Sequence, residues 1–113
     1  KTRVPLKVNI LKDRNTLSRE ADDGSIENIY RLQIMNTGDL TRTFRISIAG
    51  IENIHLDDDK TITVTGGEIG TRTAIVRTNP GAAKSGANPI RFSVEDIDDP
   101  TVAVTELSKF WMP

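Results

Sequence analysis

The chain has 113 residues, yet it contains no cysteine, a single histidine and only 4% aromatic residues. The absence of cysteine excludes a disulfide framework and any iron–sulfur cluster held by thiolates of this chain. No apolar run approaches the roughly 20 residues that a membrane-spanning helix needs. An excess of one charge is also lacking, because 15 basic and 16 acidic residues leave a net charge of −1. That balance argues against nucleic acid binding, which requires a basic surface.

Alternation of apolar and polar residues with a period of two is the dominant pattern in the sequence. Such alternation is typical of strands that bury one face. No segment shows the apolar stripe of a helix, and residues 80–84 have room for one helical turn at most. The inward-facing sets predicted from the pattern are Leu6, Val8 and Ile10; Tyr30, Leu32 and Ile34; Phe44, Ile46 and Ile48; Ile62 and Val64; Ile90, Phe92 and Val94.

In two further strands the alternation does not define a single inward-facing set of residues. In residues 70–77 either Ile75 or the pair Ala74 and Val76 could face the core. The last strand begins with Val102 and Val104 facing inward and then places Leu107 out of phase. Because a slip of one residue would turn every following side chain to the wrong face, we predict a bulge or a strand break near residues 105–107.

Turn-forming residues separate these segments. Seven short strands divided by turns within about a hundred residues predict an all-β, immunoglobulin- or fibronectin-like sandwich of two antiparallel sheets, formed by residues 1–113 as one domain. A small SH3-like or OB-type barrel is the alternative, although seven strands exceed what those folds usually contain. The turn signals are Asp23-Gly24, Asn36-Thr37-Gly38, Gly66-Gly67, Asn79-Pro80, Asn88-Pro89 and Asp99-Pro100.

Two acidic clusters raise the question of a calcium site, since hard cations bind clustered carboxylates. Neither cluster has the spacing of a loop that folds around the ion, and both precede strands, where aspartate commonly caps turns. We therefore expect turn formation rather than metal binding from Asp57-Asp58-Asp59 and from Asp96-Ile97-Asp98-Asp99.

His55, Met35 and Met112 are the side chains in the chain that copper(I) prefers. A lone imidazole cannot form a site without partners, and the sequence places none beside it. We expect Met35 to fill space at a strand end and Met112 to lie in the terminal tail. The prediction is that no residue of this chain holds a metal, a cofactor or a catalytic role.

The remaining candidates also suggest structural roles. Residues 66–70 are rich in glycine but lack the lysine and the helix of a phosphate-binding loop, so they predict a turn. The serines have no base beyond the single histidine and no nucleophile elbow, which argues against hydrolase chemistry. Of Phe110 and Trp111, we expect one ring to close the end of the sandwich and the other to be partly exposed.

The chain resembles the C-terminal immunoglobulin-like domain of FixG/CcoG-type proteins, which are accessory to assembly of cbb3-type cytochrome oxidases. The resemblance spans essentially the whole chain, and its first half is the more specific part. It rests on Arg3, Pro5-Leu6, Asp13-Arg14-Asn15, Gly24, Ile26-Glu27-Asn28-Ile29-Tyr30, Asn36, Gly67-Glu68, Pro80, Asn88-Pro89-Ile90, Phe92 and Asp98-Asp99-Pro100.

The resemblance implies a longer parent protein in the bacterial inner membrane, with several transmembrane helices and two ferredoxin-like [4Fe–4S] motifs. This domain would follow the last membrane helix on the periplasmic side, and the parent would supply electrons that reduce copper for the oxidase. None of the cluster cysteines falls in this chain. The shared residues suggest structural roles: Asp13 and Asn15 would order a loop, Gly24 would supply backbone freedom, and Asn36 would form a turn.

Three functions follow from this resemblance. The first is a non-catalytic interaction module, soluble and monomeric by itself, that binds an oxidase subunit or a copper chaperone. The second is copper hand-off through His55 and the methionines. The third is a passive structural cap for the membrane part.

Overall fold

A computed structural model describes residues 4–12, 18–57 and 60–113 of the chain. These residues form strands and turns, with no helix among them, so none of the described part could cross a membrane as a helix. The strands are β1 (Leu6–Lys12), β2 (Arg19–Glu20), β3 (Ile26–Asn36), β4 (Arg42–Ala49), β5 (His55–Leu56), β6 (Thr61–Val64), β7 (Ile69–Thr78), β8 (Gly86–Asp96) and β9 (Asp99–Met112). The predicted seven strands correspond to the longer ones, and β2 and β5 are additional two-residue strands.

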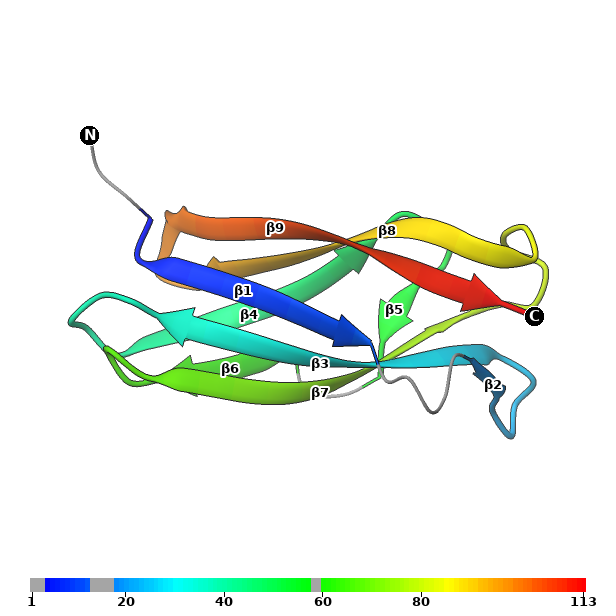
Figure 1. Cartoon of the computed structure of the whole chain (residues 1–113), viewed down its shortest axis with the longest axis horizontal. Helices are drawn as coiled ribbons and strands as arrows, with labels where there is room; N and C mark the ends of the chain where they lie inside the picture. Colours follow the sequence, from blue (N-terminus) through cyan, green and yellow to red (C-terminus); the bar gives the residue numbers. More distant parts are fainter. Residues whose placement is uncertain (1–3, 13–17, 58–59) are drawn as a thin grey trace.

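The strands form two antiparallel sheets that pack face to face (Figure 1). Sheet A has the order β1-β3-β7-β5, with β2 beside the start of β3. Sheet B has the order β6-β4-β8-β9. The resulting sandwich is elongated, with extents of 43 × 23 × 22 Å. The predicted all-β, immunoglobulin-like sandwich without a disulfide is therefore confirmed.

The core lies where the inner faces of the two sheets meet, as the alternation predicts. Among the predicted inward sets, Ile10, Ile48 and Ile62 are half-buried and the others are buried. In β7, Ala74 and Val76 are buried, which resolves the ambiguous phase in favour of this pair. The largest fully buried side chains are Tyr30, Phe44, Phe92, Phe110, Leu32, Ile34, Ile46 and Ile90.

The predicted bulge or strand break near residues 105–107 is wrong. The pairing of β8 with β9 runs without interruption from Gly86↔Met112 to Glu95↔Ala103, and the irregularity falls beside the hairpin turn, between Glu95 and Asp96. Leu107 keeps the regular phase and is exposed on the outer face, with 76% of its surface accessible. An isolated apolar residue on a solvated face is ordinary. One apolar residue out of phase with the alternation therefore does not by itself indicate a bulge.

The placement of Met112 in a terminal tail is also wrong. Met112 is the last residue of β9, is 6% exposed and belongs to the core. The expectation for the aromatic pair before it is confirmed, because Phe110 is fully buried and Trp111 is half-buried. The alternation of β9 thus continues to the end of the strand and adds two large side chains to the core.

Candidate functional site

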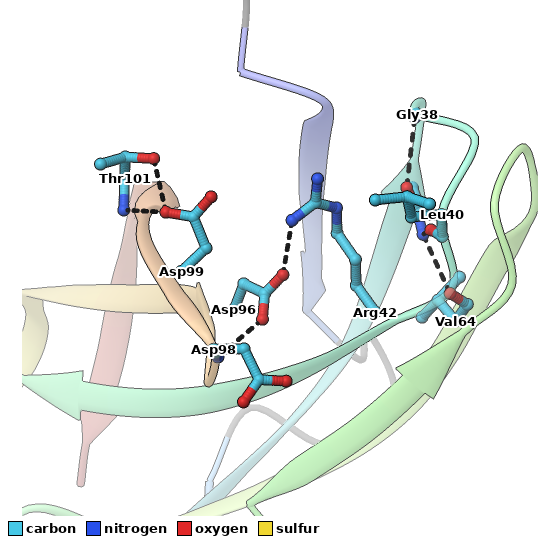
Figure 2. Close-up of polar contacts among 9 residues, drawn as sticks. Gly38, Leu40, Arg42, Val64, Asp96, Asp98, Asp99 and Thr101 are labelled. Carbon is cyan, nitrogen blue, oxygen red and sulfur yellow. Dashed lines mark hydrogen bonds and ion pairs between the residues drawn. The ribbon is translucent and has the colours of Figure 1, made fainter.

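The acidic cluster at residues 96–99 forms a turn and an ion pair (Figure 2). Asp96 is 4% exposed; its carboxylate accepts a hydrogen bond from the backbone N–H of Asp98 at 2.8 Å and pairs with Arg42 at 2.6 Å. Asp99 accepts from both the hydroxyl and the backbone N–H of Thr101, and these bonds lower the pKa of the Asp99 carboxyl. The turn interpretation of this cluster is confirmed.

The second acidic cluster is described only in part. Asp57 forms an ion pair with Arg77 at 3.0 Å, whereas Asp58 and Asp59 lie outside the described residues. Within residues 4–12, 18–57 and 60–113, no group of three or more histidine or acidic side chains is arranged to hold a metal ion.

The candidate copper ligands do not come together. His55 is exposed on β5, opposite Arg77 and, one strand further, Glu27 of β3. Glu27 precedes Met35 by eight positions on β3, which is about 26 Å at roughly 3.3 Å per residue. Met112 points into the core, and Nδ1 of His55 lies 2.9 Å from the carbonyl oxygen of Asn53. Met35 is thus remote from His55, and Met112 lies on the other side of sheet A.

The glycine-rich segment is a turn between the two sheets, as predicted. It joins β6 of sheet B to β7 of sheet A, and Gly67 adopts a positive φ of 78°, which suits glycine. Asn36, 1% exposed, ties this turn to the neighbouring one: its amide nitrogen donates to the carbonyls of Leu40 and Val64 at 2.7 and 2.9 Å (Figure 2). The predicted turn-forming role of Asn36 is confirmed.

Asn28 is another member of the segment that carries the resemblance, and it connects the two sheets. Its side chain is fully buried; Oδ1 accepts from the backbone N–H of Trp111 at 2.7 Å, and Nδ2 donates to the carbonyl of Trp111 at 3.0 Å. Nearby, the hydroxyl of Tyr30 donates to the carbonyl of Lys109 at 2.6 Å. These bonds fasten the last part of β9 to β3. Asp13 and Asn15 lie outside the described residues.

A buried carboxylate on β3 was not identified from the sequence. Glu27 is 3% exposed and is paired with Arg19 of β2 and with Arg77 of β7. Arg77 also reaches Asp57, so the charges of the group nearly balance. The sequence signal was weak, since Glu27 lies between apolar residues and its partners are remote along the chain. An ion-pair network of this kind is structural, because each charge already has a partner.

A groove runs along the edges of β1 and β9, and it is the candidate binding site. The two strands lie side by side and point in the same direction (Figure 1), yet no ladder pairing joins them in the described part of the chain. We call this region the seam. The space within it is about 600 Å³ and is lined by Leu6, Lys7, Val8, Asn9, Met35, Val104 and Glu106.

The chemistry of the seam suits an extended peptide. Met35 and Val104, both half-buried, provide apolar surface, and Lys7 and Glu106 provide one charge of each sign. Unpaired strand edges present backbone N–H and C=O groups that can pair with an added strand. Further along β9, Asn28 and Tyr30 close the gap, so the open part of the seam is confined to the groove.

Comparison with known proteins connects this fold to one family. The family described as the IG-like fold at the C-terminal of FixG, a candidate oxidoreductase, matches residues 1–113. A crystal structure of a FixG-related protein from Vibrio parahaemolyticus superposes with a TM-score of 0.83 and 22% sequence identity, covering 96% of each chain. Among curated proteins, no sequence matches this chain.

Proposed function

Since the chain belongs to the family of FixG C-terminal domains, we propose that it is a non-catalytic interaction module that binds an extended segment of a protein partner along the seam. The catalytic and redox chemistry would belong to the rest of a longer FixG-type protein. The chain has no cysteine, so a [4Fe–4S] cluster would have to be held by other parts of that protein.

The open seam is the observation that carries this proposal. The outermost paired strands at the other edges of the sheets are short: β5 has two residues and β6 has four. Short edge strands are a common protection against unwanted pairing. By contrast, β1 has seven residues and β9 has fourteen, and the groove is bordered by residues 6–9 of β1 and by Val104 and Glu106 of β9. An unpaired edge beside a groove lined by both apolar and polar side chains is a geometry that strand addition can use.

The resemblance supports a more specific setting for this module. The parent would be a membrane-bound [4Fe–4S] protein of the bacterial inner membrane, and the domain would lie on the periplasmic side. The partner would be a subunit of a cbb3-type oxidase or a copper chaperone, bound during oxidase assembly. In this setting the module brings the parent's electron-transfer part close to the place where copper is reduced and inserted.

A pair of variants on β9 tests the proposal in the full-length protein. Glu106→Arg changes the charge inside the seam, whereas Thr105→Arg places the same side chain on the exposed outer face of the same strand. We expect Glu106→Arg to reduce the yield of active oxidase and Thr105→Arg to leave it unchanged, with equal amounts of both proteins in the membrane.

Deletion of the whole domain completes this experiment. If the domain acts by binding, its deletion should reduce oxidase assembly at least as much as Glu106→Arg. If deletion and both variants leave oxidase activity unaltered, the domain would be a passive cap and the proposal would be wrong.

A further inference from the structure

Exposed apolar side chains gather at one end of the sandwich. Six large apolar residues of the described chain are well exposed, and four of them belong to this end: Leu40 at 65%, Ile69 at 62%, Ile97 at 45% and Val4 at 43%. The register brings their segments together, because the start of β1 pairs with the end of β3, and Met35 of β3 pairs with Ile69. We call these four residues the apolar tip.

The turns that carry the apolar tip are held in place by hydrogen bonds and an ion pair. The side chain of Asn36 bonds to Leu40 of one turn, and its backbone bonds to Gly67 and Glu68 of another. The third turn is fixed by the pairing of Asp96 with Arg42 (Figure 2). The tip therefore presents its apolar side chains on an ordered frame, which lowers the entropic cost of binding.

The charge around the apolar tip is negative among the described residues. Asp39, Glu68 and Asp98 are exposed on its turns. Arg42 is already paired with Asp96, and Lys7 lies further along β1. Anionic lipid surfaces attract basic residues and repel acidic ones, so they are a poor match. A protein surface that is apolar and basic is the complementary partner.

The chain path suggests which protein surface this is. The N-terminal end of the described chain emerges at the apolar tip (Figure 1). The family is described as the fold at the C-terminal of FixG, so the rest of a FixG-type protein would join through the segment before β1. A surface of the preceding part of the same polypeptide would then lie directly opposite the tip.

We propose that the apolar tip docks onto an apolar, basic surface of the polypeptide that precedes this domain, and so fixes the orientation of the domain in the parent. This inference rests on the proposed function as the C-terminal module of a FixG-type protein. It adds a second, intramolecular contact at the end of the sandwich where β1 begins.

Cysteine labelling of the full-length protein in detergent tests the docking. The domain has no cysteine, so Leu40→Cys gives it a single thiol, and its labelling is read on the peptide that carries residue 40, apart from any cysteine elsewhere in the protein; Leu107→Cys on the outer face of sheet B is the matched control. We expect the tip cysteine to react roughly tenfold more slowly than the control, which corresponds to a docking preference of about 1.4 kcal/mol. Equal rates would overturn the proposal.

Charge reversal at the apolar tip, addition of anionic lipid vesicles and variation of the protein concentration identify what covers the tip. Combining Leu40→Cys with Asp39→Lys and Asp98→Lys should restore the control rate, and persistent protection would rule out a basic surface. Protection that appears only in vesicles of anionic lipid would assign the tip to the membrane. Protection that grows with protein concentration would assign it to a second copy. Either result would overturn the proposal.

These outcomes are separable from those of the seam experiment. Slow labelling of Leu40→Cys, together with an unchanged oxidase yield in Glu106→Arg, would refute binding along the seam and support the docking. Labelling of Leu40→Cys at the control rate, together with a reduced oxidase yield in Glu106→Arg, would refute the docking and support binding along the seam.

Discussion

The side-chain amide of Asn28 pairs with both backbone groups of Trp111, accepting from its N–H and donating to its carbonyl. One buried side chain on sheet A thus takes the place of a neighbouring strand for the end of β9 on sheet B. This contact closes the gap between the sheets at one end, whereas the gap between β1 and β9 stays open as the seam. Asn28 therefore sets the limit of the candidate binding site.

Replacing Asn28 by alanine should destabilise the fold strongly. Two backbone groups of Trp111 would lose their partners, and an unsatisfied buried group costs about 1–3 kcal/mol, so we expect a loss on the order of 3 kcal/mol. Denaturant unfolding, followed by the fluorescence of the single tryptophan, measures this loss. Asn88→Ala is the control, because that amide braces an exposed turn through bonds to Lys84 and Gly86. Equal effects of the two variants would refute the role of Asn28.

Tyr30 is the only tyrosine in the chain, so its ionisation can be followed by absorbance without interference. Burial raises the pKa of Tyr30 above the ordinary value of 10.0, because the charged phenolate loses its hydration. The neutral phenol therefore contributes stability that is fully present below pH 10 and is lost as the pH rises through the raised pKa. We expect no tyrosinate at pH 10 in the folded protein and half-ionisation near that pH in denaturant. Half-ionisation at pH 10 in the folded state would contradict the buried position.

The hydrogen bonds from Thr101 should make the turn of Asp99 sensitive to acid. They lower the pKa of Asp99 below its ordinary value of 3.8, so their stabilising effect is present above pH 3.8 and is lost as the pH falls through the lowered pKa. Thr101→Val removes the hydroxyl and keeps a branched side chain suited to a strand. We expect NMR titration to find the pKa of Asp99 closer to 3.8 in this variant. An unchanged pKa would show that the hydroxyl does not bond to the carboxylate.

Copper(I) should find no stoichiometric site that depends on His55. The imidazole is exposed and bonded locally to Asn53, while Met35 is remote and Met112 is buried in the core. We expect titration of the domain with copper(I) to give the same isotherm for His55→Ala and for the unaltered chain. A tight one-to-one site that disappears in His55→Ala would instead support the copper hand-off function.

The strands of this fold were predictable because burial leaves a periodic trace in the sequence. Tyr30, Leu32 and Ile34 alternate with polar residues, and all three are fully buried. The error at Leu107 has the same origin, since an apolar residue can lie on the solvated face without any change of register. Periodicity indicates which face of a strand is buried, but it does not reveal that a particular apolar residue lies on the solvated face.

Contacts between the two sheets leave no comparable trace. Asn28 and Trp111 are 83 residues apart, and no local pattern joins an amide to a distant backbone. The same holds for the buried Glu27, whose partner Arg77 lies on another strand. The apolar tip assembles from three turns and the start of β1, so only the folded chain brings its members together. The seam likewise depends on which edges remain unpaired, and that is a property of topology.

Photo-crosslinking in cells that assemble the oxidase tests the central claim most directly. A photoactivatable residue at Asn9, which is exposed within the seam, should form a covalent adduct with an extended segment of a protein partner in the full-length protein. The same residue at Thr105, on the outer face of β9, should form none. Adducts at Thr105 without adducts at Asn9, or equal adducts at both, would contradict binding along the seam.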